Sequence, residues 1–425
     1  MSSILTNNSA MVALQTLKSV NANLADTQTQ ISTGKSVANA SDNSAVWAIS
    51  KAMESDVKGF KGIQDSLALG QSTVAVARNA AETVGDLLTD IKGKIVAAQE
   101  ENVDREKIQT DITALREQIG SVVNAAQFNG LNLLSNRETE AGTGTVDILS
   151  SLDRSSDGSV ADAQIGITKQ DLGTSASVIG TTNVTAASDQ LTGTANGTAT
   201  LMTAAGTPPT QDVTVDSTSA GAGFEVTITG GAGNLATGFD TSAGDIAYVS
   251  RDGDTAADVA KGIADAFNAY VTSNAGDNAA TIKATVDGDK VTFTGSDTTG
   301  DNFSINVQEV DADENTIGGG LEALNDIDVS TSNGADAALE AIDSMIDTAI
   351  NAASDFGSAQ GRIDTQSDFI SKLSDSLKSG IGSLVDTNME EASARLQALQ
   401  TQQQLAVQAL SIANQAPQAI LQLFR

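Results

Sequence analysis

Two ladders of apolar residues with a spacing of seven stand near opposite ends of the chain. The first comprises Met53, Phe60, Leu67, Val74, Ala81, Leu88 and Ile95, and the second Ile342, Ala349, Phe356, Ile363, Ile370, Leu377 and Leu384. Each ladder corresponds to a helical stripe of roughly 63 Å at about 1.5 Å per residue. Because the two have the same length, we expect them to pack against each other as a long antiparallel coiled-coil rod.

The predicted rod domain covers residues 44–137 and 337–387. It includes a shorter helix after Asp104, in which apolar residues step by four and three, and which ends by Asn129 and Gly130. These rod-packing residues equally suit the core of any helical bundle, because periodicity alone does not identify the partner of a helix.

The terminal segments 1–35 and 390–425 have a thinner apolar stripe among many Gln, Asn, Ser and Thr residues. Pro417 is expected to interrupt the last helix before an apolar tail. The predicted self-assembly residues are Leu17, Leu24, Ile31, Leu396, Leu399, Leu410, Leu423 and Phe424. A stripe this thin buries too little area to offset the entropy of ordering the chain. We therefore expect both termini to fold when they meet other copies of the chain.

The middle of the chain changes to Gly, Thr, Ala, Ser and Asp with short alternating runs, which are typical of half-buried strands. Residues 210–310 predict a hairpin, a helix at 255–270 and a second hairpin, which together form an inserted α+β outer domain. Residues 138–209 are predicted to be a connector with β segments, and residues 311–336 a second connector. The expected fold class is therefore mainly α with an α+β insertion.

Charge is distributed unevenly within the net −31 of the chain. Residues 138–336 hold 6 basic and 30 acidic residues, which gives this region a net charge of −24. A region this acidic repels nucleic acid and anionic membranes, so neither is an expected partner. The nearly neutral ends suit close packing against other copies.

Histidine and cysteine are both absent, which excludes disulfides, thiolate nucleophiles and the usual zinc ligands. No P-loop or nucleophile elbow is present, so we expect neither an enzyme nor a cofactor. Acidic pairs such as Asp252 and Asp254 could bind calcium, but they lack the EF-hand spacing, which favours solvated turns.

No apolar run approaches the roughly 20 residues that a membrane-spanning helix needs. The first basic residue is Lys18 and no continuous apolar stretch follows it, so a cleaved signal peptide is not expected either. If the protein leaves the cell, this pattern favours another route of export.

Several short motifs at both ends resemble those of bacterial flagellins, over about 1–137 and 337–425. They are Ile4-Leu5-Thr6-Asn7-Asn8-Ser9-Ala10, Ile31-Ser32-Thr33-Gly34-Lys35, Ala40-Ser41-Asp42-Asn43, Gln127-Phe128-Asn129-Gly130, Ala413-Asn414-Gln415-Ala416-Pro417-Gln418 and Leu423-Phe424-Arg425. The resemblance implies a self-assembling subunit of a helical flagellar filament, with the termini lining its core and the middle exposed.

The same resemblance implies export through the flagellar type III apparatus with a chaperone, an extracellular location, and hook-associated and cap proteins as partners. Two alternatives stay open at this point. A hook–filament junction protein has the same architecture, and a secreted adhesin could use the acidic middle for binding.

Overall fold

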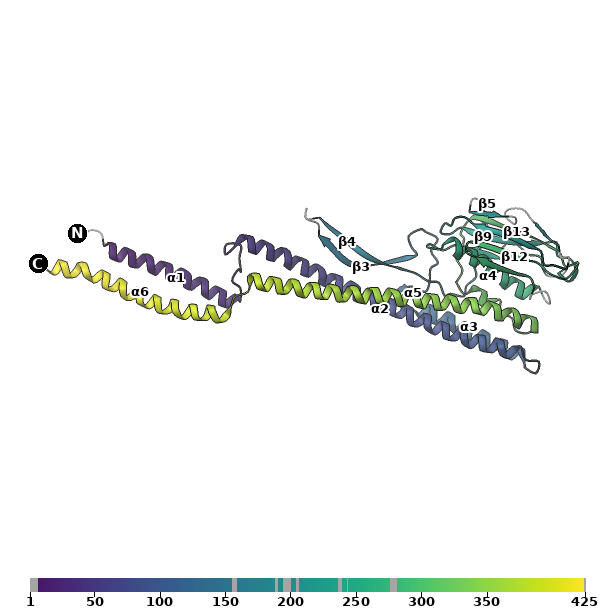
Figure 1. The fold of residues 1–425 in the computed structure, drawn as a ribbon, viewed down its shortest axis with the longest axis horizontal. Coiled ribbons are helices and arrows are strands. Elements are labelled where there is room, and N and C mark those ends of the chain that lie inside the picture. Colours follow the sequence, from purple (N-terminus) through teal and green to yellow (C-terminus); the bar gives the residue numbers. More distant parts are fainter. Residues whose placement is uncertain are drawn as a thin grey trace. The chain divides into compact units, whose positions relative to one another are not determined.

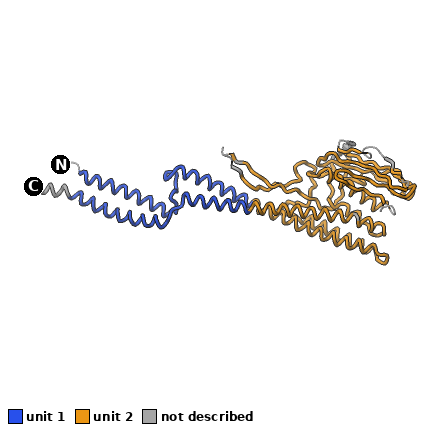
Figure 2. Tube along the Cα trace, viewed as in Figure 1, with its two compact units in different colours: residues 1–65, 368–425 blue, residues 66–367 orange. Residues whose placement is uncertain are grey.

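A computed structural model describes residues 7–154, 159–187, 190–193, 200–203, 206–235, 239–242, 244–275 and 281–423. The chain divides into two compact units, residues 1–65 with 368–425 and residues 66–367 (Figure 2). Helices α2 (Ser44–Ala98) and α5 (Ser332–Val385) each contribute to both units.

The first unit contains a pair of terminal helices, α1 (Asn8–Thr33) and α6 (Met389–Leu423), which lie side by side (Figure 1). The Asn7 amide donates to the Ala413 carbonyl over 2.8 Å, and the Gln403 amide donates to Asn21 over 2.7 Å. Because the earlier residue on α1 meets the later one on α6, the two helices are antiparallel.

Helix α6 continues through Pro417, where the sequence predicted an interruption. A proline removes one hydrogen bond from the backbone ladder, and the remaining bonds of a 35-residue helix stay available. The predicted break at this position is therefore wrong.

The rod part of the second unit contains most of α2, the shorter helix α3 (Arg105–Ala125) and most of α5. Contacts between α2 and α5 run in opposite directions along the two helices: Gln71 with Asp364, Gly85 with Ala349, Lys92 with Asp343 and Gln99 with Asp336. Each step up α2 is matched by an equal step down α5, so the expected antiparallel packing is confirmed.

Two hairpins follow α3. Strands β1 (Gln127–Phe128) and β2 (Leu131–Asn132) enclose Asn129 and Gly130, which adopt left-handed backbone conformations in the turn. Strands β3 (Thr145–Arg154) and β4 (Val160–Thr168) form a longer antiparallel hairpin. It lies against α2 at Gly70, where an added Cβ would collide with the side chain of Ile148.

The remaining strands form an inserted module with two antiparallel sheets. One sheet holds β10 (Ala247–Val249), β9 (Gly223–Thr229), β13 (Phe303–Asp313) and β5 (Thr182–Ala187), with β7 (Thr200–Met202) also paired to β13. The other holds β11 (Lys283–Asp287), β12 (Lys290–Thr294), β8 (Thr210–Val215) and β6 (Leu191–Gly193). Helix α4 (Ala256–Asn274) contacts strands of both sheets.

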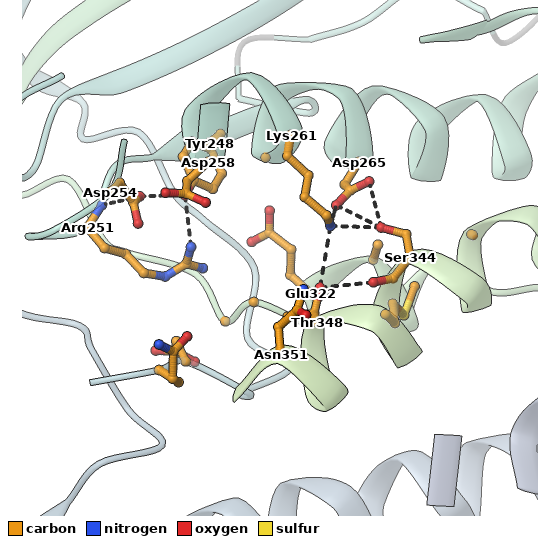
Figure 3. Close-up of a pocket in the computed structure, with 18 of the residues that line it drawn as sticks. Tyr248, Arg251, Asp254, Asp258, Lys261, Asp265, Glu322, Ser344, Thr348 and Asn351 are labelled. Carbon is orange, nitrogen blue, oxygen red and sulfur yellow. Dashed lines mark hydrogen bonds and ion pairs between the residues drawn. The ribbon is translucent and has the colours of Figure 1, made fainter. Parts of the chain in front are cut away.

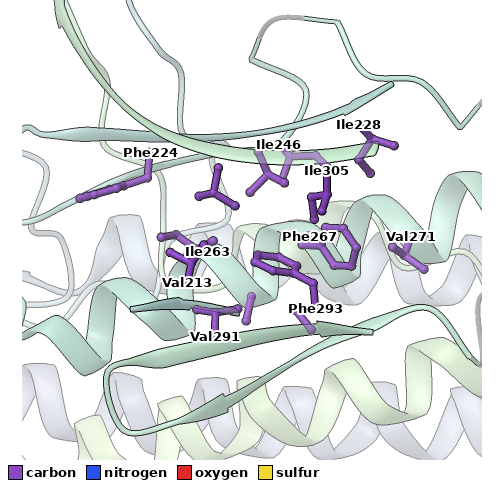
Figure 4. Packing of buried hydrophobic residues seen from close by; sticks show 14 of the residues in the cluster. Val213, Phe224, Ile228, Ile246, Ile263, Phe267, Val271, Val291, Phe293 and Ile305 are labelled. Atoms are coloured by element: carbon purple, nitrogen blue, oxygen red, sulfur yellow. The ribbon is translucent and has the colours of Figure 1, made fainter. Parts of the chain in front are cut away.

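The core of the inserted module lies between α4 and the two sheets (Figure 4). Phe267 of α4 meets Phe293 of β12 edge to face, with 5.0 Å between the ring centroids. The predicted helix, strands and β11–β12 hairpin are all present. However, β8 pairs with β12 and β9 pairs with β13, so the expected hairpin between β8 and β9 does not form.

The module also extends beyond the predicted 210–310, because β5, β6 and β7 come from the range predicted as a connector. The segments around 173–178 and 316–321 pair with each other, with hydrogen bonds of 2.7–3.0 Å that include both directions between Val178 and Thr316. We call these paired segments the stem. Gly173 and Gly319 lie so close that a Cβ on Gly319 would meet the Gly173 backbone, which explains why glycine stands there.

Candidate assembly surfaces

The terminal helix pair buries few side chains in a single chain. Val20 and Thr27 are the buried residues of α1, and residues 389–415 of α6 add Ala392, Leu399 and Ala406. Most of these are small or polar, so the apolar area that the pair removes from water is modest. The pair therefore gains little free energy from its own packing.

The predicted self-assembly residues line the inside of this pair to different degrees. Leu399 is buried, with 6% of its surface exposed, while Leu17, Leu24, Ile31, Leu396 and Leu410 are half-buried. The side chains of Leu423 and Phe424 lie outside the described residues. Whether these residues drive assembly stays a prediction.

A second set of apolar residues, which the sequence did not single out, points away from the pair. It comprises Met11, Val12, Leu14, Leu405, Val407 and Ile412. Ile412 is 69% exposed and Met11 64% exposed, which is unusual for side chains of this size that occur together. The sequence does contain a signal for this second set: α1 and α6 have apolar residues in addition to those of the seven-residue stripe.

The predicted rod-packing residues of the second unit are all buried: Leu67, Val74, Leu88, Ile95, Ile342, Phe356 and Ile363. In the first unit Phe60 and Ile370 are buried, whereas Met53 and Leu377 are half-buried.

Leu384 departs from its predicted role, because 41% of its surface is exposed, and its neighbour Val385 is buried instead. A strict seven-residue ladder drifts by about 20° per heptad around an α-helix. Over six heptads this drift moves Leu384 to a different side of the helix. The next residue, Val385, is rotated back by about 100° and faces the side on which the ladder began. The burial of Val385 follows from this drift.

A polar cavity of about 670 Å³ lies between the inserted module and the rod, within the second unit (Figure 3). On one side the ammonium of Lys261, on α4, donates to Asp265 over 2.6 Å and to Ser344, on α5, over 2.7 Å. These contacts tie the module to the rod helix by hydrogen bonds.

On the other side of the cavity Arg251 links three groups. Its guanidinium donates to the Tyr248 hydroxyl over 2.8 Å and to the Gly318 carbonyl over 2.8 Å, and the Tyr248 hydroxyl donates to Asp254 over 2.6 Å. Two buried polar atoms that line the cavity, Arg251 Nε and Asn136 Oδ1, have no hydrogen-bond partner among the described residues.

Burial shifts the pKa values of several groups that line this cavity. It raises the pKa of Glu322 to about 7, although hydrogen bonds from Ser177 and the charge of Arg251 oppose the rise. Burial also raises the pKa of Asp254, against the opposing charge of Arg251, and holds the pKa of Tyr248 well above its usual value. The sequence analysis did not identify this cluster, because Glu322 and Ser177 are far along the chain from Tyr248, Arg251 and Asp254.

The acidic pair Asp252 and Asp254, which was considered as a calcium site, makes hydrogen bonds that hold the fold together. Asp252 accepts hydrogen bonds from the Gly142 and Gly144 amides, and Asp254 accepts from Tyr248 and the Arg251 amide. Within the described ranges no group of three acidic side chains is placed to hold a metal ion. Among the helices in those ranges, none combines the length and apolar character needed to cross a membrane.

Two family models match the chain at the ends that form these surfaces. The bacterial flagellin N-terminal helical region matches residues 4–139, and the bacterial flagellin C-terminal helical region matches residues 339–424. Together they cover more than half of the chain. This chain belongs to the bacterial flagellin family.

Curated relatives of this flagellin match it from end to end. Flagellin A of Rhizobium meliloti is 38% identical over 100% of both chains, and flagellin B of the same species is 36% identical over 100% of both. The flagellin of Brucella melitensis is 29% identical, again over the full length of both chains.

A crystal structure of Xanthomonas campestris FlgL covers 78% of the flagellin chain and 99% of its own, at 11% identity and a TM-score of 0.36. The family membership rests on the family models and the full-length relatives. The protein is accordingly a structural subunit of the bacterial flagellar filament, the extracellular part of the flagellum that serves motility. The predicted family and fold class are confirmed.

Proposed function

We propose that the outward apolar residues of α1 and α6 are the surfaces through which this flagellin docks onto other copies in the filament core. One observation carries the proposal. Met11, Val12 and Ile412 are large apolar side chains that stay more than half exposed in the isolated chain. Because burying such a side chain gains about 1.5–3 kcal/mol, several of them together supply a strong drive for association.

The assignment of layers follows from charge and burial. The terminal segments carry few charges and no complete core, so they pack closely with copies of themselves. The region 138–336, with its net charge of −24, repels its own copies and stays on the outside, where water and counterions screen it.

The proposed partners follow from this role. The chain is exported unfolded by the flagellar export apparatus with an export chaperone, and it meets hook-associated and cap proteins in the extracellular filament. It acts through assembly, without catalysis, nucleic acid or membrane insertion. The thin core of the terminal pair supports such export, because little free energy is lost when the termini unfold.

The direct test is the substitution Ile412→Asp, with Thr299→Asp, at an exposed residue of the inserted module, as the control. Ile412 is exposed in the single chain, so the charge costs the monomer little stability, whereas it would be costly in a dry interface. We expect Ile412→Asp to remove filaments from the pellet after centrifugation and from electron micrographs, while Thr299→Asp assembles normally.

A second substitution, Leu410→Asp, tests the inner side of the same helix. Leu410 is half-buried in the pair, and we expect this variant to fail in assembly as well. Wild-type amounts of filament from Ile412→Asp, at wild-type protein concentration, would contradict the proposed docking surface.

A further inference from the structure

Helices α4 and α5 face each other across the polar cavity of the second unit. Residues that line the cavity recur at steps of three and four on both helices: Asp258, Lys261 and Asp265 on α4, and Ala341, Ser344 and Thr348 on α5. Such a spacing places side chains on one face of a helix. Each helix therefore turns one face toward the cavity, and the module is joined to the rod here by side chains that reach across it.

A single ammonium group makes this connection (Figure 3). Lys261 Nζ donates to Asp265 over 2.6 Å, to Ser344 over 2.7 Å and to Thr348 over 3.4 Å. An ammonium has three hydrogens to donate, so each of them has an acceptor. Because two of the three acceptors belong to α5, the hydrogen bonds of Lys261 join the two helices.

The two hydroxyl groups on α5 make further hydrogen bonds. The Thr348 hydroxyl donates to the Ser344 carbonyl over 2.9 Å, and the Ser344 hydroxyl donates to Asp265 over 3.4 Å. Each hydroxyl thus accepts one hydrogen bond from Lys261 and donates another. Hydrogen bonds are directional, so a network in which every member has its partners fits one placement of α4 on α5.

The other attachments of the module restrict its angle less. The stem, through which the chain enters and leaves the module, contains the run Gly318-Gly319-Gly320, and glycine permits larger backbone changes than any other residue. Ala337 of α5 also packs against the core of the module. An apolar contact of this kind has no preferred direction. The contacts of Lys261 therefore define the angle most closely.

We propose that Lys261 is the positioning residue that fixes the angle of the inserted module on the rod, with the stem as the hinge about which the module turns once the contacts of Lys261 to α5 are lost. The inference does not depend on the proposed docking surface of the termini. Under the proposed arrangement of layers, this angle sets the spacing between the acidic modules of neighbouring copies.

The test measures the distance between one spin label on the module and one on the rod, by double electron–electron resonance on the isolated full chain. The chain has no cysteine, so Thr299→Cys in the module and Ser121→Cys on α3, both at exposed residues, carry the only labels. With Lys261 in place we expect a single narrow distribution of distances.

Lys261→Met keeps an unbranched side chain and removes the ammonium, so a second population should appear at a different distance. The ratio of turned to aligned modules should rise on the order of tenfold. This is the low end for hydrogen bonds to a charged group, because 43% of the Lys261 side chain is exposed. Ser344→Ala combined with Thr348→Val removes the acceptors on the rod and leaves the pair of Lys261 with Asp265, and it should produce the same second population.

Lys290→Met is the matched control. Lys290 pairs with Asp212 over 3.0 Å within one sheet of the module, and 41% of its side chain is exposed. Its loss removes an ion pair of the same kind without touching the rod, so the distribution should stay as in the wild type. Exchange protection of α4 reports whether the module of each variant is folded.

A second measurement needs no variant. Acetylation of lysine amines in the wild type, followed residue by residue by mass spectrometry, should modify Lys261 more slowly than the equally exposed Lys290, because all three hydrogens of the Lys261 ammonium are hydrogen-bonded. Acetylation of Lys261 as fast as that of Lys290, or an unchanged distance distribution in a folded Lys261→Met variant, would overturn the proposal.

Discussion

Phenylalanine rings fill the core of the inserted module, whereas the helices α1 and α6 contain no aromatic residue at all. The module packs α4 against two sheets and buries side chains such as Phe267 and Ile305 completely. The terminal pair leaves residues such as Ile412 in water. A single copy of the chain thus completes one region and leaves the other incomplete.

This difference shows where stability is placed in a protein that must assemble. The module has a buried core of its own, so we expect changes on its surface to leave assembly unaffected. Under the proposed docking, we expect the terminal helices to gain most of their burial from neighbouring copies, which makes folding and polymerisation a single coupled step. The predictions below test this division, beginning with the largest expected effect.

Phe267→Ala should destabilise the inserted module by about 3–5 kcal/mol, because it leaves a cavity beside Phe293. Thermal unfolding of the isolated chain, followed by exchange protection of α4, measures this loss. Filaments should still form at temperatures where the variant module is folded. Phe369→Ala is the control, because 55% of the Phe369 side chain is exposed and its loss should change stability little.

Gly70→Ala should destabilise the packing of the β3–β4 hairpin on α2 by about 1–3 kcal/mol, because the new Cβ displaces Ile148. Gly93→Ala, on the same helix, meets no atom within 4 Å and should stabilise α2 by up to about 1 kcal/mol. Exchange protection of residues 145–152 distinguishes the two variants. An equal gain in protection from both would contradict the described contact.

Leu399→Ala should change the stability of the isolated chain least. A buried leucine usually costs about 2–5 kcal/mol when truncated, and Leu88→Ala in the rod should show this value. In the terminal pair we expect less than about 0.5 kcal/mol, since the pair contributes little before assembly. The critical concentration for assembly should nevertheless rise at least about tenfold, which corresponds to about 1.4 kcal/mol.

The sequence predicted the helical part of the fold well, because long apolar periods persist in α2 and α5. It missed the exposure of Leu384, since the drift of a seven-residue ladder accumulates only over many turns. The alternation of apolar and polar residues also predicted the strands β8 and β9, but the two were wrongly expected to pair with each other as a hairpin. Alternation shows which face of a strand is buried and does not show which strand is its neighbour.

The stem and the Glu322 cluster could not be predicted in the same way. Residues 311–336 look like a connector because they are rich in glycine and acidic residues, yet the run Gly318-Gly319-Gly320 permits the close backbone pairing of the stem. The chain leaves the module beside the place where it entered, and only this return brings Glu322 close to Ser177 and Arg251. For the terminal pair, the sequence identified the inner seam, and only the structure separated it from the outward residues.

The most direct test of the coupled folding of the termini is hydrogen–deuterium exchange on the same protein as monomer and as filament. The account predicts that residues 8–33 and 389–415 exchange freely in the monomer and become strongly protected in the filament, while α4 has the same protection in both. Strong protection of both terminal helices in the isolated monomer would contradict it.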